Sequence, residues 1–192
     1  MTLLIAGLIL FLGAHSIRIC ADGWRSRQIA RFGATAWKIG YSAVSLIGLG
    51  LIILGFGQAR QAPVLLWAPP AGMPHLTALL VLLAFILIAA AYVPRNHIKA
   101  RLHHPMLLGV QAWALGHLLA NGELAGIILF ASFLVWALLD LKAARRRDRD
   151  QETRYAAGAL PGTMLSLVAG VLIWLGFLVK LHGVLIGVPV LG

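Results

Sequence analysis

Residues 76–93 read LTALLVLLAFILIAAAYV, and none of these eighteen side chains carries a charge. An α-helix needs about 20 mostly apolar residues to cross the hydrocarbon core of a bilayer, with a range of about 17 to 25. Backbone polar groups find no water there, so a crossing segment must satisfy its hydrogen bonds within its own helix. The stretch therefore predicts a transmembrane helix.

Five further apolar runs predict the same structure. They are Met1–Ile17, Ile39–Phe56, Pro105–Leu119, Leu124–Leu141 and Thr163–Leu181. The run that begins at Pro105 is short, and it reaches a spanning length only when it is extended from His103 to Asn121. Strands are excluded because the runs do not alternate polar and apolar residues. The sequence predicts an all-α integral membrane bundle of six transmembrane helices, forming a single domain over residues 1–192.

The composition agrees with this interpretation. The chain has 192 residues, of which 60% are hydrophobic and 11% charged, whereas soluble chains are about half apolar and a quarter charged. The net charge of +10 does not indicate nucleic-acid binding, because the charges lie in short segments between the apolar runs. Cys20 is the only cysteine, which excludes an internal disulfide and a cysteine-based metal cluster.

The positions of the lysines and arginines predict the orientation. The segments Arg18–Lys38, Pro94–His104 and Lys142–Arg154 hold five, three and six of the sixteen basic residues. Only Arg60 and Lys180 lie elsewhere. Because cytoplasmic loops of membrane proteins are enriched in lysine and arginine, these three segments are expected on the cytoplasmic side. Both termini are then non-cytoplasmic.

The segments between the runs give weaker signals. Gly23–Trp37 is basic and semi-polar, which leaves open a helix lying at the membrane interface or a solvated loop. Gln58–Pro74 is expected to be an irregular loop, and Gly183–Gly192 can fold back against the outer face. Glycines in the second run suggest close helix packing or a surface that faces a flat ligand; they are Gly48, Gly50, Gly55 and Gly57.

Two histidines fall inside predicted spans, where a titratable side chain is expensive and often functional. A glycine and an aromatic residue precede each histidine at intervals of four: Gly7, Phe11 and His15, and Gly109, Trp113 and His117. This spacing places the three side chains on one helix face. Two such faces opposite each other would hold a b-type haem between two imidazoles. The alternative is that each histidine hydrogen-bonds a carbonyl or hydroxyl of a neighbouring helix.

The remaining histidines are less informative. Structural or solvated roles are expected for His97 and His103, His104 is left open, and no special role is expected for His75 and His182. The chain has no sequence motif of a zinc protease, a serine hydrolase, a P-loop or a dithiol site. No carboxylate lies in the middle of a predicted span, so a proton-coupled transporter is disfavoured.

Two blocks of the sequence resemble the NnrU family of bacterial membrane proteins, which is associated with nitrite and nitric oxide metabolism. One block is His104-Pro105 with Gly109, Trp113 and His117. The other is Gly13-Ala14-His15-Ser16 with Arg18. The resemblance extends over nearly the whole chain and implies a multi-pass protein of the bacterial inner membrane. The implied role is accessory to denitrification.

The NnrU family is in turn similar to plant zeta-carotene isomerase, a haem-b membrane enzyme. By this resemblance the two haem-ligating histidines fall on His15 and His117. The isomerase has a cysteine, implicated in redox ligand switching, where this chain has Ala114, which puts isomerase activity in doubt.

The resemblance implies haem b between the first and fourth predicted helices. Phe11, Gly109 and Trp113 would line its pocket, and Arg18 would pair with a propionate or extend to the interface. The depths of His15 and His117 differ by about 14 Å at 1.5 Å per residue, so His104 is kept as a reserve ligand. Expected partners are membrane lipid and a redox partner or nitrogen-oxide enzyme. The alternatives are a haem-dependent isomerase of a polyene lipid and a cofactor-free structural or assembly protein.

Overall fold

A computed structural model describes residues 1–188 and 190, and this part of the chain is helical without a strand. The long helices are α1 (Thr2–Cys20), α2 (Asp22–Ala59), α3 (Met73–Tyr92), α5 (Pro105–Ala120), α6 (Leu124–Asp150) and α7 (Leu160–Gly176). The short elements are α4 (His97–Leu102), the π-helical turn η1 (Phe177–Leu181) and α8 (His182–Ile186). The prediction of an all-α protein is confirmed.

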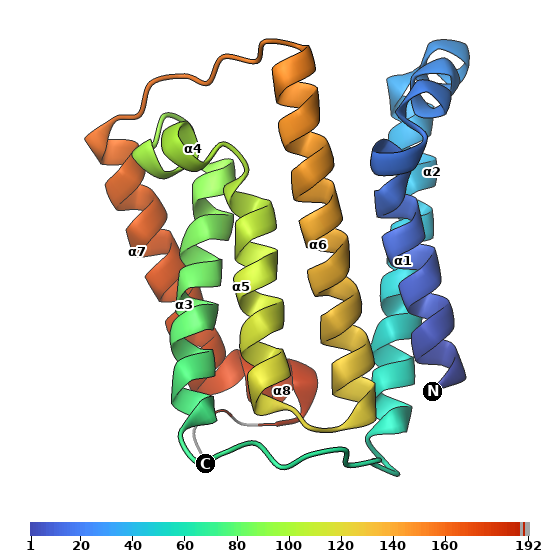
Figure 1. Ribbon diagram of the computed structural model, residues 1–192, viewed down its shortest axis with the longest axis vertical. Helices are drawn as coiled ribbons and strands as arrows, with labels where there is room; N and C mark the ends of the chain where they lie inside the picture. The colour runs from blue at the N-terminus through green and yellow to red at the C-terminus, as the bar shows by residue number, and fades with distance from the viewer. Residues whose placement is uncertain (189, 191–192) are drawn as a thin grey trace.

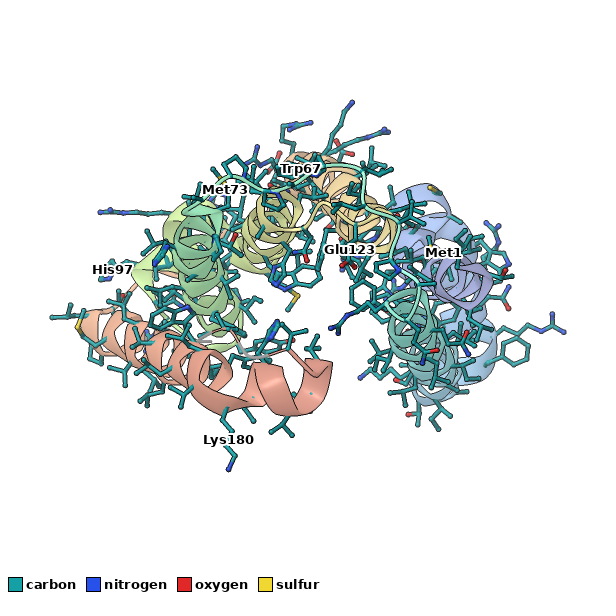
Figure 2. All side chains as sticks on the ribbon, turned by 90° about the horizontal axis from the view of Figure 1, so that it is seen from below. Met1, Trp67, Met73, His97, Glu123 and Lys180 are labelled. Carbon is teal, nitrogen blue, oxygen red and sulfur yellow. The ribbon has the colours of Figure 1, made fainter. Side chains whose placement is uncertain are left out.

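The long helices stand side by side in an open arc (Figures 1 and 2). Along the arc, α7 packs on α3, α3 on α5, α5 on α6, α6 on α1, and α1 on α2. Helix α6 therefore joins the α1–α2 pair to the rest of the bundle. Phe130 and Leu129 of α6 share a buried cluster with Leu4 and Leu8 of α1.

Five of these helices are long and apolar enough to cross a membrane, namely α1, α2, α3, α6 and the continuous stretch Leu160–Ile186. Helix α5 is apolar but has only 16 residues. The expected extension to His103 and Asn121 is wrong. His103 has a left-handed backbone (φ 63°) and ends α4, whereas Asn121 is extended and ends α5.

Helix α2 is longer than its apolar run because the basic segment before it is also helical. The helical alternative for Gly23–Trp37 is therefore confirmed. A break interrupts the helix at Gly33, where φ is 83° and ψ is 156°, a conformation that costs glycine little and other residues much. The loop after α2 is irregular as predicted, and its Leu65 forms an isolated bridge with Glu123.

Two of the four glycines of the second run make the expected close contact between α1 and α2. A Cβ on Gly48 would come within 2.8 Å of the Phe11 amide nitrogen, and one on Gly55 would collide with the Leu4 amide nitrogen. Gly50 and Gly57 face open space. The prediction is correct for the first pair, which lies two helical turns apart on one face, and wrong for the second.

The three basic segments gather at one end of the bundle, which we call the basic end (top of Figure 1). Helix α6 continues past Leu141 to Asp150 and carries its basic residues to this end. The N-terminus and the loops that follow α2 and α5 lie at the opposite end (Figure 1). Helix α8 is tied to the end of α2 there, because Arg60 Nη1 donates to the Ile186 carbonyl at 2.8 Å. The predicted fold-back of Gly183–Gly192 includes residues 189, 191 and 192, which lie outside the described residues.

The glycine contacts predict different effects for two otherwise similar substitutions. Gly55→Ala is expected to lower the free energy of unfolding by about 1 to 3 kcal/mol, because the new methyl group overlaps the α1 backbone. Gly57→Ala, two residues along the same helix, is the matched control and is expected to be neutral. Thermal unfolding in detergent measures both, and equal midpoints for the two variants would contradict the α1–α2 packing.

Candidate functional site

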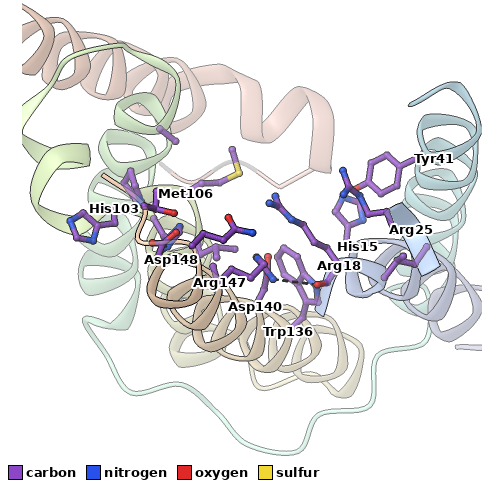
Figure 3. A pocket seen from close by; sticks show the side chains of 18 of the residues that line it. His15, Arg18, Arg25, Tyr41, His103, Met106, Trp136, Asp140, Arg147 and Asp148 are labelled. Atoms are coloured by element: carbon purple, nitrogen blue, oxygen red, sulfur yellow. Dashed lines mark hydrogen bonds and ion pairs between the residues drawn. The ribbon is translucent and has the colours of Figure 1, made fainter. Parts of the chain in front are cut away.

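A cavity of about 770 Å³ opens at the basic end of the bundle. Its walls come from α1, α2, α6, the junction of α4 with α5, and the loop after α6 (Figure 3). Ile17, Trp37, Leu107 and Trp136 give it apolar surfaces. The cavity therefore combines apolar walls with the polar ends of several helices.

Positive charge dominates the lining. Five lysine or arginine side chains line the cavity: Arg18, Arg25, Lys38, Lys99 and Arg147. The two acidic residues of the lining already have partners, since Asp140 lies 3.4 Å from Arg147 Nη2 and Asp148 lies 2.7 Å from His104 Nε2. This excess of cations favours an anionic ligand.

His15 of α1 lines this cavity with one ring nitrogen fixed. Its Nδ1 donates to the Phe11 carbonyl at 2.7 Å, one helical turn back, and its ring stacks on Phe11 with a centroid distance of 4.2 Å. The rings of Tyr41 and Trp136 lie 5.2 and 5.8 Å away. A histidine that donates through Nδ1 to an oxygen leaves Nε2 as the free lone pair, which is the usual arrangement of a metal-binding histidine.

Trp136, beside His15, has an unsatisfied donor. Its Nε1 is buried and finds no hydrogen-bond acceptor among the described residues. A buried N–H group without a partner is costly, and native proteins rarely leave one. A ligand with an acceptor oxygen, such as a carboxylate, would satisfy it.

A second histidine of the cavity, His104, belongs to a polar cluster. Its Nε2 lies 2.7 Å from Asp148 Oδ2, and the Tyr155 hydroxyl donates to the same oxygen at 2.8 Å. Burial, followed by the neighbouring Asp148, raises the pKa of Tyr155 to about 12. His103 stacks on the Tyr155 ring at 4.2 Å. A carboxylate that accepts from Nε2 of His104 leaves Nδ1 as the nitrogen for a further partner.

The local backbone explains how His104 reaches this position. Pro105 begins α5, where its missing N–H is no loss, and the left-handed His103 turns the chain from α4 into α5. Asp148 comes from the extension of α6 beyond its apolar run. Three segments that are distant in sequence therefore supply the cluster.

His117 repeats the local geometry of His15 on α5. Its Nδ1 donates to the Trp113 carbonyl at 2.9 Å, and its ring lies 5.3 Å from Trp113 and 4.6 Å from Phe130. In both helices the acceptor is a carbonyl of the same helix, rather than of a neighbouring one as the alternative proposed. His182 of α8, for which no role was expected, lies 6.5 Å from His117 between ring centroids.

The structure brings some of the predicted site residues together and separates others. His15, Arg18 and His104 line the cavity, whereas His117 is not among its lining residues. A row of aromatic contacts joins His15 to His117 through Phe11, Phe133 and Trp113. The pairing of His15 with His117 on one iron stays a prediction.

Gly109 and Ala114, two further positions that the sequence analysis named, are both buried in the bundle. Gly109 packs against α3, where a Cβ would come within 2.9 Å of the Ala84 carbonyl oxygen. Ala114, which stands where the isomerase has a cysteine, is completely buried.

Sequence reasoning missed several residues of the site. Asp148 and Tyr155 were not predicted, and they follow His104 by 44 and 51 residues. The only signal in the sequence was an acidic residue inside the basic run Arg145–Arg149. Trp136 and Asp140 gave no signal, because their positions depend on the packing of α6 against α1.

The polar cluster predicts how Tyr155 titrates. Its hydroxyl is expected to ionise near pH 12, above its ordinary value of 10. Asp148→Asn should lower this pKa toward 10, because the neighbouring negative charge disfavours the phenolate, while burial keeps part of the shift. The titration is followed by the absorbance of tyrosinate, and the part of this absorbance that Tyr155→Phe removes belongs to Tyr155. An unchanged pKa in Asp148→Asn would contradict the pairing.

Comparison with known proteins adds one finding. A family model described as NnrU protein matches residues 3–190. No curated protein and no solved structure matches the chain.

Proposed function

The chain belongs to the NnrU protein family, and on that premise we propose that it binds haem b in the cavity at its basic end. The role would be accessory to nitrite and nitric oxide metabolism, in the bacterial inner membrane. A haem bound there would supply one-electron chemistry, and its iron would bind nitric oxide once one of its two histidine ligands gives up its position. The observation that carries the proposal is His15, whose Nδ1 is fixed and whose Nε2 is free, in the wall of a cationic cavity.

The residues of the cavity fit this group. Haem b is an apolar plate with two carboxylates, and the cavity has apolar walls and five cationic side chains. Arg18 is the nearest of these in sequence to His15 and is suited to one propionate. The unsatisfied N–H of Trp136 suits an acceptor oxygen of the same ligand.

His104 would be the second histidine that holds the haem. It lines the same cavity as His15, and Asp148 orients its ring through Nε2, as carboxylates orient many metal-binding histidines. His117 was predicted for this position, but it lies at the far end of the aromatic row. We therefore favour His104 over His117 as the second haem ligand.

The proposed orientation places the basic end in the cytoplasm and both termini outside. It rests on the gathering of the three basic segments at one end (Figure 1), which the positive-inside rule associates with the cytoplasmic face. Cationic side chains of the cavity would then face the cytoplasm.

Absorption spectra test the ligand assignment. The detergent-purified protein is expected to show the Soret and visible bands of six-coordinate haem b in the oxidised and reduced states. His15→Ala and His104→Ala should each abolish the six-coordinate form, while His117→Ala and the exposed control His75→Ala should keep it. A change in His117→Ala but not in His104→Ala would restore the predicted pair. Absence of a Soret band after haem loading would favour the cofactor-free alternative.

Cys20 offers a test of orientation without a tag. This only cysteine is exposed and ends α1 at the basic end. A membrane-impermeant maleimide is expected to label it in inside-out vesicles and not in intact spheroplasts. The matched control is Cys20→Ala with Gln61→Cys, which moves the thiol to the opposite end and should reverse the pattern. Labelling of Cys20 from outside would overturn the proposed orientation.

A further inference from the structure

The N-terminal segment of α2, residues 22–32, is helical up to the break at Gly33. Only Ala21 separates this segment from α1. Its two ends therefore continue into helices that are long and apolar enough to cross a membrane, α1 on one side and the rest of α2 on the other. A segment held at both ends in this way stays at the membrane surface.

The packing of α1 against α2 sets the depth of this segment. Gly48 of α2 packs against Phe11 of α1. Cys20 comes nine residues after Phe11, and Ile39 comes nine residues before Gly48. Because the two helices run in opposite directions (Figure 1), Cys20 and Ile39 stand at about the same level. At 1.5 Å per residue, Gly33 then lies roughly 9 Å beyond that level.

The charges next to this level mark the edge of the hydrocarbon. Arg18 is the first charged residue after the first apolar run, and Lys38 is the last one before the second. Charged side chains are expensive inside the hydrocarbon and gather at its edge. The headgroup layer beyond that edge is roughly 5 to 8 Å thick on each side of the bilayer. We therefore expect the N-terminal segment of α2 to lie among the lipid headgroups.

The segment has an inner face and an outer face. Arg25 and Ile29 belong to the inner face, since both line the cavity at the basic end, and Arg25 Nη1 lies 3.4 Å from Asp22 Oδ1. Trp24 and Phe32 belong to the outer face, where 45% and 60% of their surfaces are exposed. The cavity therefore accounts for the inner face and leaves the outer face without a role.

Two cations complete the outer face. Arg27 and Arg31 are exposed and lie one helical turn apart, on the same side of the helix. Within residues 1–188 and 190, neither of them forms an ion pair. The Arg31 guanidinium carbon lies 5.0 Å from the centre of the Phe32 ring, and the Trp24 ring meets Trp37 edge-on at 5.7 Å. Exposed aromatic rings beside basic side chains are typical of helices that lie in a membrane interface.

We propose that the outer face of this segment binds the headgroups of anionic phospholipids. Arg27 and Arg31 contact the lipid phosphates, for which the guanidinium group is well shaped. Trp24 and Phe32 anchor the helix at the level where aromatic rings are enriched in membrane proteins. The negative charge of the lipid complements two cations that lack a protein partner among the described residues. This binding requires neither the haem nor the proposed orientation, so its test is independent of both.

Quenching of tryptophan fluorescence tests the lipid preference in vesicles that contain the full chain. Phosphatidylglycerol or phosphatidylcholine, brominated near the start of its acyl chains, is mixed at equal fractions into unlabelled phosphatidylcholine. Trp24→Phe is measured in parallel in each background, and the difference gives the quenching of Trp24 itself. Both leaflets have the same composition, so the direction in which the protein inserts does not matter.

Two double variants test the arginines. Arg27→Gln with Arg31→Gln removes two charges one helical turn apart from the outer face. Arg145→Gln with Arg149→Gln removes two exposed charges with the same spacing from α6, at the same end of the bundle, and is the matched control. Thermal unfolding checks that both variants keep the fold. The comparison of the two lipids in the unaltered chain needs no substitution and holds whatever the stability of the variants.

Trp24 is expected to prefer phosphatidylglycerol over phosphatidylcholine on the order of fivefold or more. Loss of Arg27 and Arg31 should remove most of this preference, whereas the control variant should keep most of it. Added salt should weaken the preference, because the contacts are exposed. Equal quenching by the two lipids in the unaltered chain would overturn the proposal. So would an equal loss in the two double variants, because the total charge of the basic end would then attract the lipid.

Discussion

The structure depends on one constraint: inside hydrocarbon every backbone N–H and carbonyl must be paired within the protein. This constraint makes each apolar run a helix and leaves charged side chains at or beyond the ends of the apolar runs. Because three of the connecting segments carry most of the basic residues, one end of the bundle becomes strongly cationic. The cavity lies there, between the α1–α2 pair and the helices on the other side of α6.

The same helical backbone prepares the histidines. A carbonyl one turn earlier accepts from Nδ1 of His15 and from Nδ1 of His117, and the aromatic residue that supplies the carbonyl also packs beside the ring. The helix that carries each of these two histidines therefore orients its ring without a contact from a neighbouring helix. His104 is oriented instead by Asp148, which is distant in sequence. His182 is oriented by the carbonyl of Val188, which follows the end of its helix.

The sequence predicted what local periodicity and hydropathy control. The helices and the loop after α2 follow from the distribution of apolar and polar residues along the chain. The close approach at Gly48 and Gly55 and the repeated glycine–aromatic–histidine face follow from spacings of seven and four residues. Asp148 could not be predicted, because its contact with His104 requires α6 to continue beyond its apolar run. His182 could not be predicted either, since a π-helical turn and a left-handed glycine set its direction, and neither has a clear sequence signal here.

The haem b that we propose lies at the basic end, close to His15, and a distance-dependent measurement tests this position. A nitroxide spin label on Cys20, five residues from His15, is compared with a label on Gln61→Cys in a Cys20→Ala background. Oxidised haem is paramagnetic and shortens the relaxation time of a nearby nitroxide. The stronger effect is expected at Cys20, and an equal or stronger effect at position 61 would contradict a haem at the basic end.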